Sequence, residues 1–243
     1  SKDRELADYR KGLLDGEHAA RAPRQRIVAL SLFTTQSASA DLEKIRAQIK
    51  RSRPAPVDFA IGVSAAGPER AVFPLASVAG IQFSRQTGSA PVFSTGFLPT
   101  PALGIVPGAV GQVAYGRFRS PDYQTADKFI PPTGSWLGQP KPQGHNDLTL
   151  QLFVPAGPKP AGGWPVAIFG HGFTDSMYGA PWTVAAVLAS QGIATASINV
   201  VGHGGGALGT LSVLRSTRLP VQVPAGGRGI DQDGNGTIDS TEG

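Results

Sequence analysis

The segment from Trp164 to Val201 constrains the fold of this chain more strongly than any other stretch. Residues 164–170 are apolar and partly β-branched, which predicts a short buried strand that ends in a glycine-flanked histidine. Residues 181–191 carry a helical apolar stripe, and residues 193–201 predict another buried strand. A strand, loop, helix and buried strand in this order predict an α/β fold with a mostly parallel sheet.

Two regions of different texture make up the chain. Residues 147–155 alternate between apolar and polar side chains, so the predicted α/β region extends from there over 147–243. Residues 1–146 predict a β-rich region with short apolar segments between Gly, Pro and Ser clusters. Apolar stripes at helical spacing predict two helices in this region, near 3–15 and 39–51.

Composition excludes several classes of protein. The 32 Gly and 21 Pro residues indicate many turns and short strands rather than a helical bundle, and the absence of Cys excludes disulfides and thiol catalysis. The net charge of +5 arises in the first 53 residues, which hold 12 Lys and Arg against 7 Asp and Glu. These charges are mixed in sign and lack interleaved aromatic residues. We therefore expect a solvated helix surface and no nucleic-acid partner.

The tetrapeptide Gly170-His171-Gly172-Phe173 is the first candidate for chemistry. Glycines after a buried strand let a loop approach a substrate closely, and main-chain N–H groups can then stabilise an oxyanion. The expected donor is the N–H of Phe173, and its ring would line the acyl site together with Thr174 and Asp175. The alternative is a tight turn in which His171 is bonded to backbone.

A second glycine-rich stretch, Gly202-His203-Gly204-Gly205-Gly206, contains the HGGG sequence of some oxyanion loops. Because it follows a later strand, we interpret it as a flexible turn on the edge of the site, with His203 among the substrate-binding residues. A phosphate-binding role lacks both the P-loop spacing and its Lys. A Ser176–His203 catalytic pair has no nucleophile elbow to present the serine.

The most specific motif is a calcium loop of the EF-hand type near the C-terminus. Oxygen-bearing side chains fall at positions 1, 3, 5, 9 and 12 of the loop, with Gly at position 6 and a carbonyl ligand at position 7. A loop rather than a helix precedes it, which argues against a helix–loop–helix sensor. We expect structural Ca²⁺; an acidic turn is the alternative. The expected ligands are Asp231, Asp233, Asn235, Thr237, Asp239 and Glu242.

Four stretches together give the chain a family resemblance. They are Leu30–Ser37 (LSLFTTQS), Phe169–Gly172 (FGHG), Asn199–Gly206 (NVVGHGGG) and Gly227–Gly243 (GRGIDQDGNGTIDSTEG). With them the chain resembles the N-terminal part of α/β-hydrolases, and more narrowly the bacterial extracellular lipases and esterases of the virulence-factor type. The resemblance implies the N-terminal half of an α/β-hydrolase sheet, ester hydrolysis by a Ser-Asp-His triad, and a secreted or cell-surface location.

The nucleophile that this resemblance implies is missing from the chain. No G-x-S-x-G pentapeptide occurs in the 243 residues. We therefore expect a companion chain from the same precursor to carry the triad, while Gly172 and Phe173 supply the oxyanion loop. Lipids, short-chain esters and polyesters are all compatible substrates, and residues 207–226 are a candidate lid. The competing interpretation is a non-catalytic, calcium-stabilised surface or adhesion module.

Overall fold

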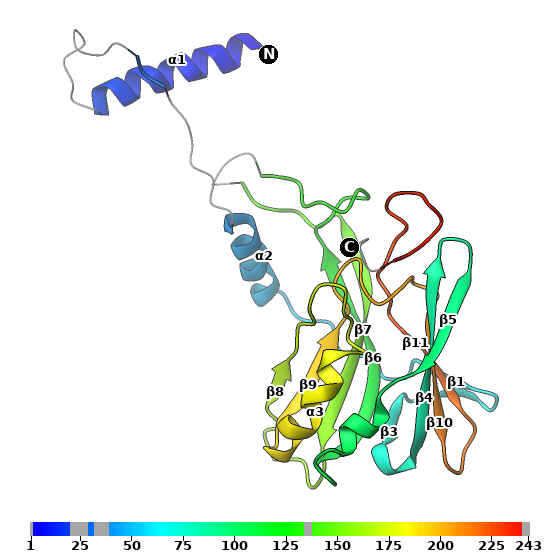
Figure 1. Cartoon of the computed structure of the whole chain (residues 1–243). Helices are drawn as coiled ribbons and strands as arrows, with labels where there is room; N and C mark the ends of the chain where they lie inside the picture. The colour runs from blue at the N-terminus through cyan, green and yellow to red at the C-terminus, as the bar shows by residue number, and fades with distance from the viewer. Residues whose placement is uncertain (1, 20–28, 32–38, 134–137, 240–243) are drawn as a thin grey trace. The chain divides into compact units, whose positions relative to one another are not determined.

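The computed structural model describes residues 2–19, 29–31, 39–133 and 138–239 (Figure 1). Residues 1–52 and 132–140 form one compact unit, and residues 53–131 and 141–243 form another. Two predictions, for Glu242 and for most of Leu30–Ser37, lie outside the described residues. No helix in the described part of the chain has the length and apolar character needed to cross a bilayer.

Two helices belong to the first unit, α1 (Lys2–Ala19) and α2 (Ala40–Arg51). They cover the ranges expected from the two apolar stripes. Ser39 occupies the N-cap of α2: its carbonyl accepts the Glu43 N–H at 2.9 Å, and its Oγ donates to Glu43 Oε1 at 2.7 Å. The first bond is the ordinary helix bond between a residue and the one four before it, and the second joins two side chains, so Ser39 marks the start of α2 without capping its free N–H groups.

The proline-rich segment 132–140 belongs to this unit as well, because side chains of α2 bind its carbonyls. Lys44 Nζ donates to the carbonyl of Gly138 at 2.7 Å, and Gln48 Nε2 donates to that of Pro140 at 3.0 Å. The carbonyls of Gly138 and Pro140 thereby have donors from α2. The segment therefore forms part of a unit, although its composition is that of a linker.

Two sheets form the second unit (Figure 1). The six-stranded sheet has the order β2-β1-β11-β10-β4-β5, and the five-stranded sheet has the order β3-β6-β7-β9-β8. The strands of the six-stranded sheet are β1 (Gly62–Ser64), β2 (Gly67–Glu69), β4 (Val78–Gly88), β5 (Val92–Phe97), β10 (Thr210–Arg215) and β11 (Val221–Pro224). Those of the five-stranded sheet are β3 (Val72–Pro74), β6 (Val110–Asp122), β7 (Gly144–Pro155), β8 (Val166–Ile168) and β9 (Ala194–Ile198). The helical elements of this unit are α3 (Ala180–Ser190) and two 3₁₀ turns, η2 (Leu75–Ser77) and η3 (Thr100–Gly104).

The prediction of an α/β fold with a mostly parallel sheet is wrong. The protein is mainly β, and neither sheet is the parallel sheet of an α/β-hydrolase. Among the described strands, every pairing is antiparallel except that of β8 with β9. The alternating segment predicted at 147–155 forms most of β7, which pairs antiparallel with both β6 and β9. One strand–helix–strand connection, β8-α3-β9, does not make a parallel sheet, because β7 on the other side of β9 runs antiparallel to it.

Residue 146, where the two textures meet in the sequence, lies inside β7. Both sheets combine strands from the two sides of this position. In the six-stranded sheet β10 pairs with β4 and β11 pairs with β1, and the five-stranded sheet joins β3 and β6 to β8 and β9 through β7. The candidate lid at 207–226 is the β10–β11 hairpin together with its flanks, so most of it belongs to the six-stranded sheet. The sheets therefore join the chain into a single unit across the expected boundary.

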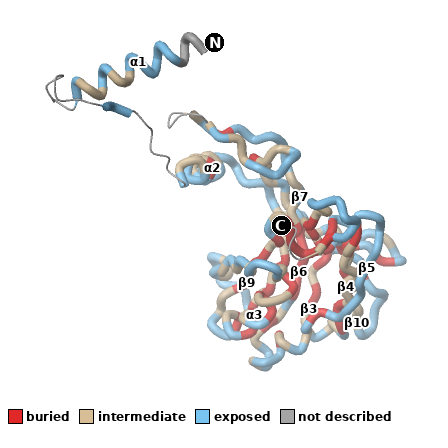
Figure 2. Tube along the Cα trace, turned by 45° about the horizontal axis from the view of Figure 1, so that its top comes forward, coloured by how far each residue is buried: buried red, intermediate tan, exposed pale blue. Residues whose placement is uncertain are grey.

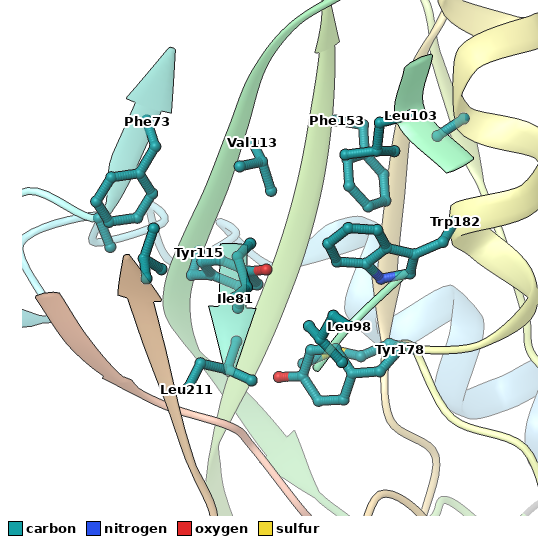
Figure 3. Close-up of a cluster of buried hydrophobic side chains, with 14 of the residues drawn as sticks. Phe73, Ile81, Leu98, Leu103, Val113, Tyr115, Phe153, Tyr178, Trp182 and Leu211 are labelled. Atoms are coloured by element: carbon teal, nitrogen blue, oxygen red, sulfur yellow. The ribbon is translucent and has the colours of Figure 1, made fainter. Parts of the chain in front are cut away.

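The buried core lies between the two sheets and under α3 (Figures 2 and 3). Trp182 of α3 is fully buried, and its ring meets that of Phe153 of β7 edge-on at 5.0 Å. Its indole Nε1–H donates to Oε1 of the buried Gln151 at 3.1 Å, which satisfies the polar end of an otherwise apolar ring. This packing fixes the start of α3, and with it the loop that leads there from β8.

Candidate functional site

Two loops meet beside the start of α3, one before that helix and one after β9. His171 belongs to the first loop, and its Nε2 accepts the Val200 N–H of the second at 3.2 Å. His203 belongs to the second loop, and its Nε2 accepts the Thr174 N–H of the first at 3.3 Å. The two imidazole rings lie 5.0 Å apart. Each histidine therefore holds the backbone of the opposite loop.

The contacts of the other ring nitrogen, Nδ1, indicate the tautomer of each histidine. His171 Nδ1 lies 3.0 Å from the carbonyl of Gly172, and His203 Nδ1 lies 2.9 Å from that of Val201. A nitrogen beside a carbonyl must carry the hydrogen, so we assign both rings as neutral Nδ1–H tautomers. Because Nε2 already accepts a backbone N–H, neither ring has a free lone pair with which to act as a general base. This is the backbone-bonded role named above as the alternative for His171.

The main-chain N–H groups of Gly172 and Phe173 have no acceptor among the described residues. On the far side, the N–H of Thr174 is bonded to His203, and that of Asp175 donates to the carbonyl of Gly172 at 3.2 Å. Thr174 has φ of +65°, a left-handed conformation that is uncommon for a β-branched residue. Hydrogen bonds thus hold the backbone at Thr174 and Asp175, directly after the two N–H groups that have no acceptor. The surrounding contacts keep Thr174 in its strained conformation.

The side chain of Phe173 points toward solvent. Its surface is 70% exposed, and its ring meets that of His203 edge-on with the centroids 5.9 Å apart. The ring, which was expected to line an acyl site, lies on the solvent side of the loop. The ring of this residue is therefore open to solvent, and its N–H has no acceptor among the described residues.

A cavity of 90 Å³ lies next to the loop. Three of the residues expected to bind substrate line it, namely Thr174, Asp175 and His203. Asp175 also has a structural role, because its Oδ2 accepts the Ala180 N–H of the first turn of α3 at 3.1 Å. Sequence reasoning missed Phe83 and Arg85, which line the same cavity from β4. They precede the loop by about 90 positions, and no local pattern marks them.

The stretch 202–206 is buried, in contrast to the flexible edge turn expected from its glycines. Gly206 N–H donates to the carbonyl of Gln86 at 3.0 Å, and the carbonyl of Gly205 accepts the Gly229 N–H at 2.8 Å. Gly204 has φ of +81°, and a Cβ there would lie 2.3 Å from Nδ2 of Asn199. The glycines therefore allow close packing of several backbones rather than mobility.

Asn199 is a further residue that sequence reasoning missed. It is 1% exposed; its Oδ1 accepts the Met177 N–H at 2.9 Å, and its Nδ2 donates to the carbonyl of Gly226 at 2.9 Å. One side chain thus joins the loop before α3 to the segment after β11. Its position directly after the apolar strand β9 was the only signal of this role in the sequence.

The calcium motif adopts a tightly curled loop. Asp231 Oδ2 accepts the Gly236 N–H at 2.9 Å, and Asp233 Oδ1 accepts the Asn235 N–H at 3.0 Å. Asn235 Oδ1 in turn accepts the Thr237 N–H at 2.7 Å. These bonds turn the backbone around the side chains at positions 1, 3 and 5, so the oxygens of these side chains curve about one region.

The end of this loop is anchored on β4. Ile238 is buried, and its N–H donates to the carbonyl of Thr87 at 2.9 Å, while Thr237 forms a β-bridge with Gly88. Asp231 Oδ1 is buried and has no hydrogen-bond donor in the described part of the chain. A buried carboxylate oxygen without a donor fits a cation ligand.

The described acidic side chains do not by themselves complete a metal site. They include no cluster of three or more His, Cys, Asp or Glu side chains that could hold a metal ion. The motif adds an amide from Asn235 and a backbone carbonyl, and its twelfth position, Glu242, lies outside the described residues. The residues present therefore fit Ca²⁺ in kind, as a set of oxygen ligands.

Comparisons with models of protein families, with curated proteins and with solved structures find no match to this chain.

Proposed function

We propose that this chain forms the oxyanion wall of a carboxylic-ester hydrolase that works through a serine acyl-enzyme. The observation that carries the proposal is the N–H of Phe173, which has no acceptor among the described residues and lies beside an N–H fixed by His203. A serine that attacks an ester carbonyl leaves negative charge on the carbonyl oxygen. A preorganised main-chain donor stabilises that charge without reorganising.

The two histidines act as supports for this loop. Their Nε2 atoms accept the N–H groups of Val200 and Thr174, so neither takes the proton of a nucleophile. The base and the nucleophile therefore come from residues outside this chain, in agreement with the missing G-x-S-x-G sequence. Within the proposal, Gly172 and Phe173 stabilise charge, and the ring of Phe173 contacts the ester.

A companion polypeptide from the same precursor would supply these groups, and strand β8 supports this part of the proposal. It lies at the edge of the five-stranded sheet, and its Val166 and Ile168 side chains are 55% and 86% exposed. An edge strand with apolar side chains and free backbone groups is a site for another strand. Intact-mass analysis of material from the natural source tests this: a lone 25.1 kDa species contradicts it.

Calcium has a structural role in this proposal. The motif oxygens of Asp231, Asp233, Asn235, Thr237 and Asp239 would hold the ion, with Glu242 as the last ligand. Their carboxylates would be held close together with their negative charge offset by the ion. The residues of the loop themselves connect to β4 through Ile238 and Thr237, so ordering the loop also orders the strand end beside the cavity. A secreted or cell-surface location belongs to the proposal and rests on the resemblance to extracellular lipases.

Labelling with a fluorophosphonate tests the catalytic proposal. We expect the protein together with its companion to form a covalent adduct on a serine of the companion and to hydrolyse a p-nitrophenyl ester, because only an activated serine reacts. This chain is expected to carry no label. Absence of both the adduct and the hydrolysis contradicts the proposal.

One observation favours the alternative of a calcium-stabilised surface or adhesion module. All six residues of β5 are exposed, and they include Phe93 and Phe97 at the edge of the six-stranded sheet. Exposed aromatic side chains on an edge strand are typical of a binding surface. This module would form no fluorophosphonate adduct, so the same labelling experiment separates the two functions.

A further inference from the structure

Among the described residues, Arg85 is the one cationic side chain that lines the cavity beside the Thr174 loop. It lies two residues after Phe83 on β4, so both side chains leave the same face of the strand. The Phe83 ring packs against that of Tyr178 with the centroids 4.8 Å apart, which directs this face toward the segment before α3. Arg85 is thereby placed opposite Thr174 and Ser176.

The glycine-rich stretch holds the stem of this arginine in place. Gly205 has φ of +78°, and a Cβ at this position would lie 2.6 Å from Cγ and 3.2 Å from Nε of Arg85. The same Cβ would lie 2.8 Å from the carbonyl oxygen of Gln86. Only a glycine can cover the arginine stem so closely, so the HGGG sequence serves to seat this side chain.

The guanidinium of Arg85 has no acceptor in the described part of the chain. Its Nε is buried without a hydrogen-bond partner, and no carboxylate of these residues forms an ion pair with it. Buried N–H donors of a charged group are nearly always bonded. An arginine held in a cavity with free donors therefore points to a ligand that supplies the acceptor.

We propose that Arg85 anchors a binding site for a carboxylate group in this cavity. Two carboxylates also line it: Asp175 is bonded to the start of α3, and Asp239 belongs to the proposed calcium loop. Their charges disfavour a multiply charged anion, so a singly charged carboxylate fits better than phosphate. A planar guanidinium matches a carboxylate with two parallel hydrogen bonds. Only the identity of the natural ligand, an ester with a free carboxylate, rests on the proposed function.

Nuclear magnetic resonance of the calcium-loaded chain tests this site with sodium acetate as the probe. We expect acetate to shift the Arg85 Nε–H resonance saturably, whereas sodium chloride at equal ionic strength and neutral acetamide leave it in place. Inorganic phosphate is expected to bind more weakly than acetate. An unshifted Nε–H resonance, an equal response to chloride, or tighter binding of phosphate overturns the proposal.

Two variants make the test specific. Arg85→Gln is expected to weaken acetate binding by about tenfold or more, because charge-assisted hydrogen bonds are lost. Arg70→Gln, which changes an exposed arginine between β2 and β3, is expected to bind acetate like the unmodified chain. Equal affinity in Arg85→Gln contradicts the site. If this variant does not fold, as its backbone amide spectrum reveals, the titration of the unmodified chain decides.

Binding of acetate requires no hydrolysis, so the failure of this site and the failure of the proposed function are distinguishable. If the chain binds acetate through Arg85 but supports no ester hydrolysis, the carboxylate site is upheld and the proposed function is contradicted. If esters are hydrolysed but acetate has no effect on Arg85, the proposed function is upheld and the carboxylate site is contradicted.

Discussion

Gln151 illustrates how a single polar residue positions the candidate site. It is fully buried on β7; its Oε1 accepts the Trp182 Nε1–H at 3.1 Å, and its Nε2 donates to the carbonyl of Met177 at 2.7 Å. It also bonds Ser197 Oγ at 3.3 Å. One amide thereby joins two strands, α3 and the loop before this helix. Leu150 and Leu152 flank Gln151 in the alternating strand, so the pattern predicts an exposed Gln151, and the sequence alone did not reveal its buried role.

Gln151→Leu is expected to lower the free energy of unfolding by about 2–4 kcal/mol, because the Trp182 N–H and the Met177 carbonyl are left buried and unpaired. Denaturant titration measures this. The matched control Gln112→Leu changes an exposed glutamine of β6 and is expected to alter stability by about 0.5 kcal/mol at most. Equal effects of the two substitutions would show that the Gln151 bonds contribute nothing.

An ion pair gives a pH-dependent prediction. Two hydrogen bonds from Arg215, at 2.8 and 3.2 Å, hold the pKa of Glu69 below its ordinary value of 4.5. A carboxyl with a lowered pKa in the folded state stabilises the protein above its unfolded pKa, and this stabilisation is lost as the pH falls through the folded value. Glu69→Gln should therefore lower the melting temperature at pH 7, and the difference should shrink near pH 3. A difference independent of pH contradicts this.

At the scale of elements, the curled C-terminal loop was the part of the fold most easily predicted from the sequence. Its spacing predicts the curl, and the bonds from Asp231, Asp233 and Asn235 to the following N–H groups give it physical form. The bounds of the strands were harder to predict. The apolar segment predicted at 164–170 forms a strand only over Val166–Ile168, because the backbone must leave the sheet to reach the His171 loop.

Calcium is expected to raise the melting temperature of the chain, since an ion that binds only the folded state stabilises it. Asp231→Asn should remove most of this rise, because a buried carboxylate oxygen becomes part of an amide. Asp127→Asn, in an exposed turn, is the control and should keep the full rise. If EDTA changes neither the melting temperature nor the calcium content, the metal site is absent.

At the scale of the whole molecule, periodicity predicts which residues are extended and not which strands pair. The β10 pairing with β4 joins Leu211 to Phe83 across more than 100 residues, and no local pattern encodes it. The prediction of a mostly parallel sheet was wrong for this reason. The same long-range pairing brings Arg85 beside His203, so the cavity could not be predicted from the loops alone.

The most direct test of the oxyanion proposal replaces one backbone N–H group with an oxygen atom. In the protein with its companion, Phe173 is replaced by phenyllactic acid, which substitutes an ester oxygen for the N–H and keeps the ring. We expect kcat for ester hydrolysis to fall about 100- to 1,000-fold, as on loss of an oxyanion donor. Phe173→Ala, which keeps the N–H, should retain kcat within about tenfold. Unchanged kcat in the phenyllactic acid variant would contradict the account.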